Sequence, residues 1–172
     1  MGLLAQQINR RHFVKLPSTE KRLVGDRIVR ILGGDPSPKV SGLPARRGWG
    51  DGGIDGRTQV LDVQNQETEA AFAVRIASKP FSRDELGAFI LAMDREKLWA
   101  GIIVTAMGLA PDAQIEMGRK NREGKFVLLH LSIEDILEGN LPAEPLKFKD
   151  GGLSERLKES LRDFLLHREP TD

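Results

Sequence analysis

Two aspartates in a glycine-rich segment are the residues whose types and spacing could do chemistry. Asp51 and Asp55 lie within Gly48–Gly56, a stretch of nine residues that contains five glycines. Such a run is unfavourable inside a helix or strand, because each glycine there loses backbone entropy. It favours a sharp bend in which two carboxylates, just ahead of a predicted strand, could bind a divalent cation. Either aspartate could instead cap a turn, and Asp51 suits that role better.

The apolar run Ala71–Ala77 predicts a strand that follows this bend. Side chains alternate between the two faces of a strand. One face then carries Phe72, Val74 and Ile76, and the other carries Ala71, Ala73, Arg75 and Ala77. The second face carries small side chains and one guanidinium group. It either packs closely against a helix or lines a cleft beside the two aspartates.

The elements that must position these residues follow from periodicity and end signals. The sequence predicts helices over 3–11, from Pro17 to Gly33, from Ser82 to Lys97, over 111–121, from Ser132 to Gly139 and over 153–167. It predicts strands over 59–64, 71–77, 101–105 and 125–131, the first two forming a hairpin with a turn at 65–69. Ser82 and Glu85 have the spacing of a capping box. The expected architecture is α/β, with a mixed sheet of about four or five strands flanked by helices.

The chain length of 172 residues is enough for one domain with a real core. We expect a domain over 1–140, a linker over 141–152 and a C-terminal helix within 153–172. Leucines on one side of that helix could close the domain's own core or bind a partner protein.

The amino-acid composition excludes several kinds of functional site. The absence of cysteine excludes disulfides, thiol nucleophiles and cysteine-based zinc sites. No apolar run is long enough to span a bilayer and no signal peptide is apparent, so the expected location is cytoplasmic, with no membrane partner. Residues 1–60 contain 11 Lys and Arg against 5 Asp and Glu, whereas the rest of the chain is acidic. A basic N-terminal part is compatible with nucleic-acid contact and equally with an uneven scatter of surface charge.

Two motifs resemble a known family. The sequences GDGGIDG at 50–56 and GIIVT at 101–105, with a capped helix between them, resemble the PD-(D/E)XK or restriction-endonuclease-like superfamily, in its Mrr-like branch. The resemblance covers about residues 18–138. It implies a three-layer sandwich and a DNA-directed function in restriction, defence or DNA processing.

The resemblance also implies a metal site. In this family the residue that matches Asp55 binds Mg²⁺ or Mn²⁺, and an acidic or amide residue and a lysine, two apart on the next strand, complete the site. Those two positions fall at Arg75 and Ala77 here, and neither can do this work, because arginine stays protonated and alanine has no charge. Lys79 could act as a displaced catalytic lysine. A second carboxylate could come from Glu20, Asp26 or Asp62, with Asp51 a further weak metal ligand.

The same residues suggest how DNA would be bound. Candidate contacts are Arg46, Arg47, Trp49, Arg57 and Arg75, with Arg75 able to bind phosphate directly. The leading hypothesis is a DNA-associated nuclease-fold protein with a degraded metal site, acting by DNA binding or as a subunit. The alternatives are an active Mg²⁺-dependent endonuclease and a protein–protein adaptor. A homodimer or a larger complex could form through the C-terminal helix.

Overall fold

The computed structural model describes residues 15–36, 53–142, 144–149 and 155–166. Their helices are α3 (Ser18–Ile31), α4 (Arg83–Arg95), α5 (Pro111–Glu123), α6 (Ile133–Glu138) and α7 (Glu155–Leu166). The strands are β1 (Asp35–Pro36), β2 (Gly56–Leu61), β3 (Glu67–Arg75), β4 (Ala100–Thr105), β5 (Val127–Ser132) and β6 (Lys147–Phe148). The predicted helix over 3–11 lies outside the described residues. Among the described helices, none has both the length and the apolar composition that a membrane span requires.

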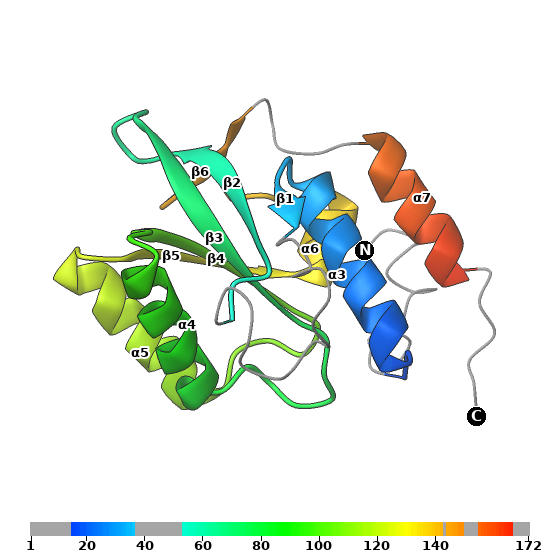
Figure 1. The fold of residues 1–172 in the computed structure, drawn as a ribbon, viewed down its shortest axis with the longest axis horizontal. Coiled ribbons are helices and arrows are strands. Elements are labelled where there is room, and N and C mark those ends of the chain that lie inside the picture. The colour runs from blue at the N-terminus through cyan, green and yellow to red at the C-terminus, as the bar shows by residue number, and fades with distance from the viewer. Residues whose placement is uncertain (1–14, 37–52, 143, 150–154, 167–172) are drawn as a thin grey trace, which may run out of the picture.

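The six strands form one mixed sheet in the order β1-β2-β3-β4-β5, with β6 also paired to β2. Strands β3, β4 and β5 are parallel, whereas β1 and β6 both run antiparallel to β2, which is itself antiparallel to β3. Figure 1 shows helices on both faces, with α4 and α5 on one side and α3 and α7 on the other. This confirms the predicted α/β three-layer sandwich.

The two faces of the sheet bury separate hydrophobic clusters. Phe72 of β3 belongs to the cluster that includes α3, α6 and α7, whereas Ala71 and Ala73 belong to the cluster under α4. The small face of β3 therefore meets a helix closely, which was one of the two predicted environments. Strand β4 is buried along its whole length, as expected for a central parallel strand.

The hairpin boundaries differ from the sequence prediction. The two strands are β2 (Gly56–Leu61) and β3 (Glu67–Arg75), so both begin earlier than predicted and the turn lies at 62–66 instead of 65–69. The cause is Asp62, whose Oδ1 accepts hydrogen bonds from the N–H groups of Gln64 and Gln66 at 2.8 and 2.9 Å. Asn65 then adopts a positive φ of 58°. A carboxylate that bonds backbone two residues on is a strong turn former, and here it ends β2.

The C-terminal part is packed on the rest of the described structure. Within the segment predicted as a linker, Lys147 and Phe148 form β6 against Leu61 and Val60 of β2. In α7, Leu161 is fully buried in the same cluster as α3. The three-part division of the chain remains a prediction, but this helix contributes at least one side chain to the main core.

Candidate functional site

Asp55 lies at the start of β2, where the glycine-rich segment enters the sheet. Its N–H donates to the carbonyl of Phe72 at 2.7 Å, and its Oδ2 accepts a hydrogen bond from the N–H of Val74 at 2.7 Å. Gly53, two residues earlier, has a φ of +106°, a conformation that favours glycine. The first bond ties the Asp55 backbone and the second ties its carboxylate to the end of β3, so the sheet fixes the position of the residue.

Gly56 allows helix α3 to approach this point. A Cβ at Gly56 would lie 2.7 Å from Val29 Cγ1 of α3 and 2.8 Å from the carbonyl oxygen of Asp35. A residue with a side chain would therefore push α3 and β1 away from β2. The glycine that follows Asp55 brings the charged residues of α3 close to the carboxylate.

Asp55 has a perturbed ionisation. Burial raises its pKa from 3.8 to about 6, against the opposing effect of the hydrogen bond from Val74. The negative charge of Asp26 on α3 raises the pKa further, whereas Arg22 and Arg75 lower it. The residue still has solvent-exposed surface, so the carboxyl group is surrounded by protein yet accessible. A perturbed pKa of this kind is frequent at functional sites.

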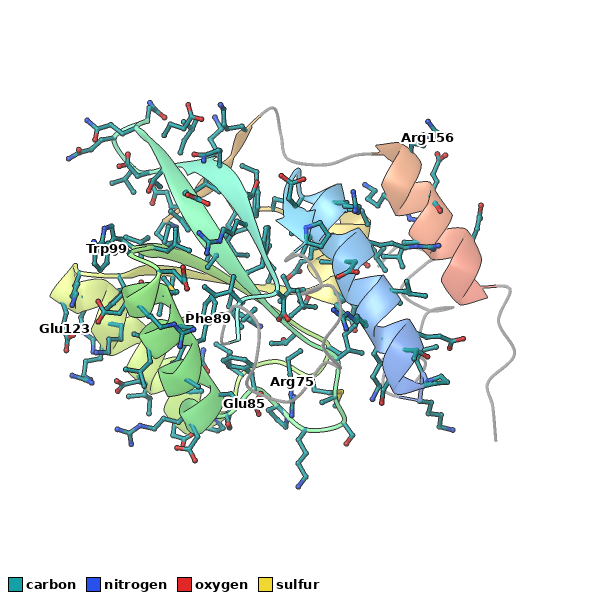
Figure 2. The ribbon with its side chains drawn as sticks, viewed as in Figure 1. Arg75, Glu85, Phe89, Trp99, Glu123 and Arg156 are labelled. Carbon is teal, nitrogen blue, oxygen red and sulfur yellow. The ribbon has the colours of Figure 1, made fainter. Side chains whose placement is uncertain are left out.

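Arg75 is the last residue of β3 and is held by helix α4. Its Nε lies 3.0 Å from Oε2 of Glu85, and the other carboxylate oxygen of Glu85 accepts a hydrogen bond from Ser82 Oγ at 3.3 Å (Figure 2). Ser82 caps α4 as predicted, accepting from the N–H of Glu85 at 3.1 Å. The prediction that Glu85 completes a capping box is wrong, because its two oxygens bind Ser82 Oγ and Arg75. The helix start and the end of β3 are thereby linked.

The register of β2 and β3 changes which residues face Asp55. Gly56 pairs with Phe72, so Asp55 lies beside Ala73 and Val74. Strand β3 also ends at Arg75, which leaves Ala77 beyond it. The residues of β3 that lie nearest Asp55 on one face of the strand are therefore Ala73 and Arg75. The predicted pair, Arg75 and Ala77, lies two residues further along the chain. Neither register places an acidic residue followed by a lysine on this face.

The other residues predicted to belong to the site lie in different parts of the structure. Lys79 is exposed in the connection between β3 and α4, and it is not among the charges that affect the pKa of Asp55. Glu20 lies half-buried in the first turn of α3. Asp62 holds the turn at the opposite end of β2, so it does not join the site. Asp51, Arg46, Arg47 and Trp49 lie outside the described residues.

Arg57 makes ion pairs with two acidic side chains. Its guanidinium lies 3.3 Å from Glu96, the residue directly after α4, and 3.7 Å from Glu69 of β3. These pairs compete with any phosphate for the guanidinium. The structure therefore gives Arg57 a position on the α4 side of the hairpin, with its charge shared between two carboxylates.

A second polar group lies one strand further along the same end of the sheet. Arg75 is paired in register with Thr105, whose Oγ1 lies 2.8 Å from His130 Nε2 on β5 and accepts from the N–H of Gly108 at 3.0 Å. Burial lowers the pKa of His130, against the opposing charge of Asp135. His130 is half-buried, and Thr105 satisfies one of its two ring nitrogens.

Sequence reasoning missed Arg22 and did not foresee the role of Glu85. The spacing of Arg22 and Asp26, four apart on one helix, was a signal that both would lie on one face of α3. Nothing in the sequence showed that this face turns toward Asp55.

The described residues do not fit the divalent ion that catalytic domains of this kind generally use. Within them, no three His, Cys, Asp or Glu side chains group as a metal site would require. The groups that act on Asp55 are one carboxylate, Asp26, and two guanidinium groups. The positive charge of the two guanidinium groups opposes Mg²⁺ binding at this pair of carboxylates, and the Glu85 carboxylate, 3.0 Å from Arg75, offsets part of that charge.

Comparisons with known proteins found one family model and several solved structures that are similar to this chain. Residues 42–132 match the Mrr catalytic-domain family model, described as a restriction endonuclease. The solved structure of the DNA modification-dependent restriction endonuclease AspBHI aligns over 94% of this chain and 38% of its own, with 19% identity and a TM-score of 0.48. MspJI restriction endonuclease, solved with a 27-mer oligonucleotide, aligns over 98% of this chain and 36% of its own, with 18% identity and a TM-score of 0.39. The chain spans less than two fifths of either protein. The comparison with curated proteins found no match.

Proposed function

The chain belongs to the Mrr-like family of restriction endonucleases, and from this we propose that it is a DNA-binding nuclease-fold protein whose metal site is degraded. It would act in restriction, defence or DNA processing by holding DNA, or as a subunit beside an active nuclease. The proposal concerns this chain, which is short relative to the solved proteins that it resembles.

One observation carries the proposal: the strand that faces Asp55 lacks the acid and the lysine that the family resemblance leads us to expect. With Asp55 beside Ala73 and Val74, the nearest same-face residues of β3 are an alanine and an arginine. Phosphodiester hydrolysis in this family needs a metal to neutralise charge and to acidify a water. A single pair of carboxylates between two guanidinium groups gives that metal a poor site.

The same charges suit phosphate binding. Guanidinium groups bind phosphate with paired, charge-assisted hydrogen bonds and do not lose their proton near neutral pH. Arg22 and Arg75 both act on the Asp55 carboxylate, one from α3 and one from β3. A DNA phosphate would compete with Glu85, 3.0 Å from Arg75, and would then be held by protein cations in place of a metal.

The test combines cleavage with binding. We expect no cleavage of supercoiled plasmid in Mg²⁺ or Mn²⁺, together with salt-sensitive binding of a labelled duplex measured by fluorescence anisotropy. Arg22→Ala should weaken binding several-fold and reduce the salt slope by about one. Arg122→Ala, an exposed arginine on α5, is the matched control and should leave binding unchanged. Metal-dependent cleavage by the wild-type chain would overturn the proposal.

An active endonuclease is the second candidate, and the closeness of Asp26 and Asp55 favours it. A cation shared between two carboxylates would remove the like-charge effect that raises the pKa of Asp55. This candidate requires Lys79, or a group from another chain, to replace the missing lysine. Cleavage that is abolished by Asp55→Ala and by Lys79→Ala, but retained in Arg122→Ala, would support it.

A further inference from the structure

Four residues on the outward side of helix α4 form a ridge, and their spacing is typical of a contact between two helices. Asp84, Ala88, Leu91 and Arg95 are separated by four, three and four residues, and all four are exposed. At 100° per residue they lie on the side opposite the buried Leu86, Phe89, Ile90 and Met93. Leu91 is 71% exposed at the middle of this ridge.

The ridge is complementary to an antiparallel copy of itself. Its midpoint falls between residues 89 and 90, so a two-fold axis there places position 84 opposite position 95 and position 88 opposite position 91. Each Asp84 then faces an Arg95, and each Leu91 faces the small side chain of Ala88. Both relationships occur twice, as an isologous contact requires.

We propose that this face of α4 binds a second copy of the chain, with the two α4 helices antiparallel. Within the described part of the chain Asp84 has no ion-pair partner, whereas Arg95 lies 3.8 Å from Glu96, a surface pair of the kind that adds little to stability. Leu91 and Ala88 would pack as knob and hole, which is the geometry of a seam with this spacing.

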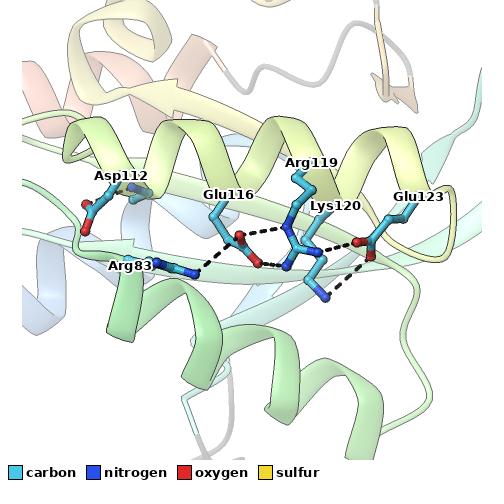
Figure 3. Close-up of polar contacts among 7 residues, drawn as sticks. Arg83, Asp112, Glu116, Arg119, Lys120 and Glu123 are labelled. Atoms are coloured by element: carbon cyan, nitrogen blue, oxygen red, sulfur yellow. Dashed lines mark hydrogen bonds and ion pairs between the residues drawn. The ribbon is translucent and has the colours of Figure 1, made fainter.

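Several charged side chains of the neighbouring helix α5 pair within the protomer. Arg119 binds Glu116 and Glu123, and Arg83 of α4 lies 3.9 Å from Glu116 (Figure 3). Ile115 of α5 is 71% exposed and could extend the apolar contact beside the α4 ridge. This inference does not depend on the proposed function.

The area of this contact is small, and we expect its affinity to be correspondingly low. One helix pair with a flanking isoleucine buries less than the roughly 1,200 Å² of the smallest stable interfaces, so we expect weak, concentration-dependent dimers. Sedimentation velocity from about 1 μM to about 1 mM should detect them. Leu91→Glu should keep the chain monomeric across this range. Val63→Glu, at a residue that is also 71% exposed but lies on the β2–β3 turn, should dimerise like the wild type.

Charge exchange tests the antiparallel arrangement. Asp84→Arg and Arg95→Asp each place like charges opposite one another, and each should raise the dissociation constant at least about tenfold. An equimolar mixture of the two variants restores both opposite-charge pairs and should dimerise, as should the double variant. Circular dichroism checks that every variant is folded. A wild-type chain that stays monomeric at every concentration, single charge variants that dimerise like the wild type, or a mixture that does not recover, would overturn the proposal.

Discussion

At the scale of single residues, Asp55 and His130 make the stability of the protein depend on pH in opposite directions. The pKa of Asp55 is raised by burial to about 6, so the folded protein binds a proton there more readily than the unfolded chain between pH 4 and 6. This group therefore adds stability as the pH falls through 6. The pKa of His130 is lowered by burial, so its contribution is full above its unfolded pKa and is lost as the pH falls below about 6.5. The two effects partly cancel in the wild type.

Replacing Asp55 with asparagine should separate these effects. Asp55→Asn keeps an oxygen for the Val74 N–H but cannot ionise, so we expect higher stability than the wild type at pH 8 and a smaller difference at pH 5. Thermal unfolding at the two pH values measures this. Asp163→Asn, at an exposed position of α7, should change neither value. Equal stabilities of Asp55→Asn and wild type at pH 8 would contradict the assigned pKa.

Thr105 should matter through its hydroxyl. Thr105→Val keeps the shape of the side chain but leaves the N–H of Gly108 and the ring of His130 without this partner. We expect a loss of about 1–3 kcal/mol in the free energy of unfolding, measured by urea denaturation. Thr68→Val, on a half-buried position of β3, is the control and should lose much less.

The candidate site could be predicted only in part from single residues. The heptapeptide around Asp55 pointed to a carboxylate that the structure places at the end of β3 with a raised pKa, because glycine at such density marks a bend with a close backbone approach. Arg22 could not be assigned, since its approach to Asp55 depends on where α3 packs over Gly56. The role of Glu85 could not be assigned either. A glutamate at this position can bind the start of its own helix or a residue such as Arg75, and tertiary packing decides between the two.

At the scale of elements, the packing of α4 on the sheet depends on small residues. A Cβ at Gly101 of β4 would lie 2.7 Å from Met93 Sδ and 2.9 Å from Phe89 Cε1, both on α4. Together with Ala71 and Ala73 of β3, this glycine lets α4 lie close to the strands. The glycine in GIIVT is therefore a packing requirement.

Substituting alanine at two glycines should have opposite effects. Gly101→Ala should destabilise the protein by about 1–3 kcal/mol, because α4 must move or Met93 must change rotamer. Gly87→Ala, in the exposed part of α4 where a Cβ meets no atom within 4 Å, should stabilise it by about 0.5–1 kcal/mol. Urea denaturation at low micromolar protein gives both values. Similar effects of the two changes would show that close packing does not decide the outcome at Gly101.

Element types were predictable and element ends were less so. The apolar run at 101–105 could only be a buried strand, and the structure confirms it as β4. The hairpin was predicted but displaced, because apolar content identified the centre of β3 while Asp62 and Asn65 determined the turn. Turn chemistry, more than hydrophobicity, fixed the register that brings Ala73 beside Asp55.

At the scale of the whole molecule, the C-terminal helix belongs to the main core. Leu161→Ala should lower the free energy of unfolding by about 3–5 kcal/mol, since Leu161 is fully buried between α7 and the cluster around α3. Denaturation with urea tests this, and Leu23→Ala, at a leucine of α3 that is 51% exposed, is the control with a much smaller expected loss. A small loss for Leu161→Ala would instead support a detachable helix.

Strand β2, which begins directly after Asp55, has consequences for the order of folding during synthesis. Its outer edge is covered by two pieces of two residues each, β1 from before it and β6 from far downstream. On the ribosome, Val60 and Leu61 therefore present an open strand edge until residues 147–148 have emerged from the exit tunnel. The sheet would be completed last beside the strand that leads from the site, and newly made chains would be most exposed to chaperones and to misassembly at this edge.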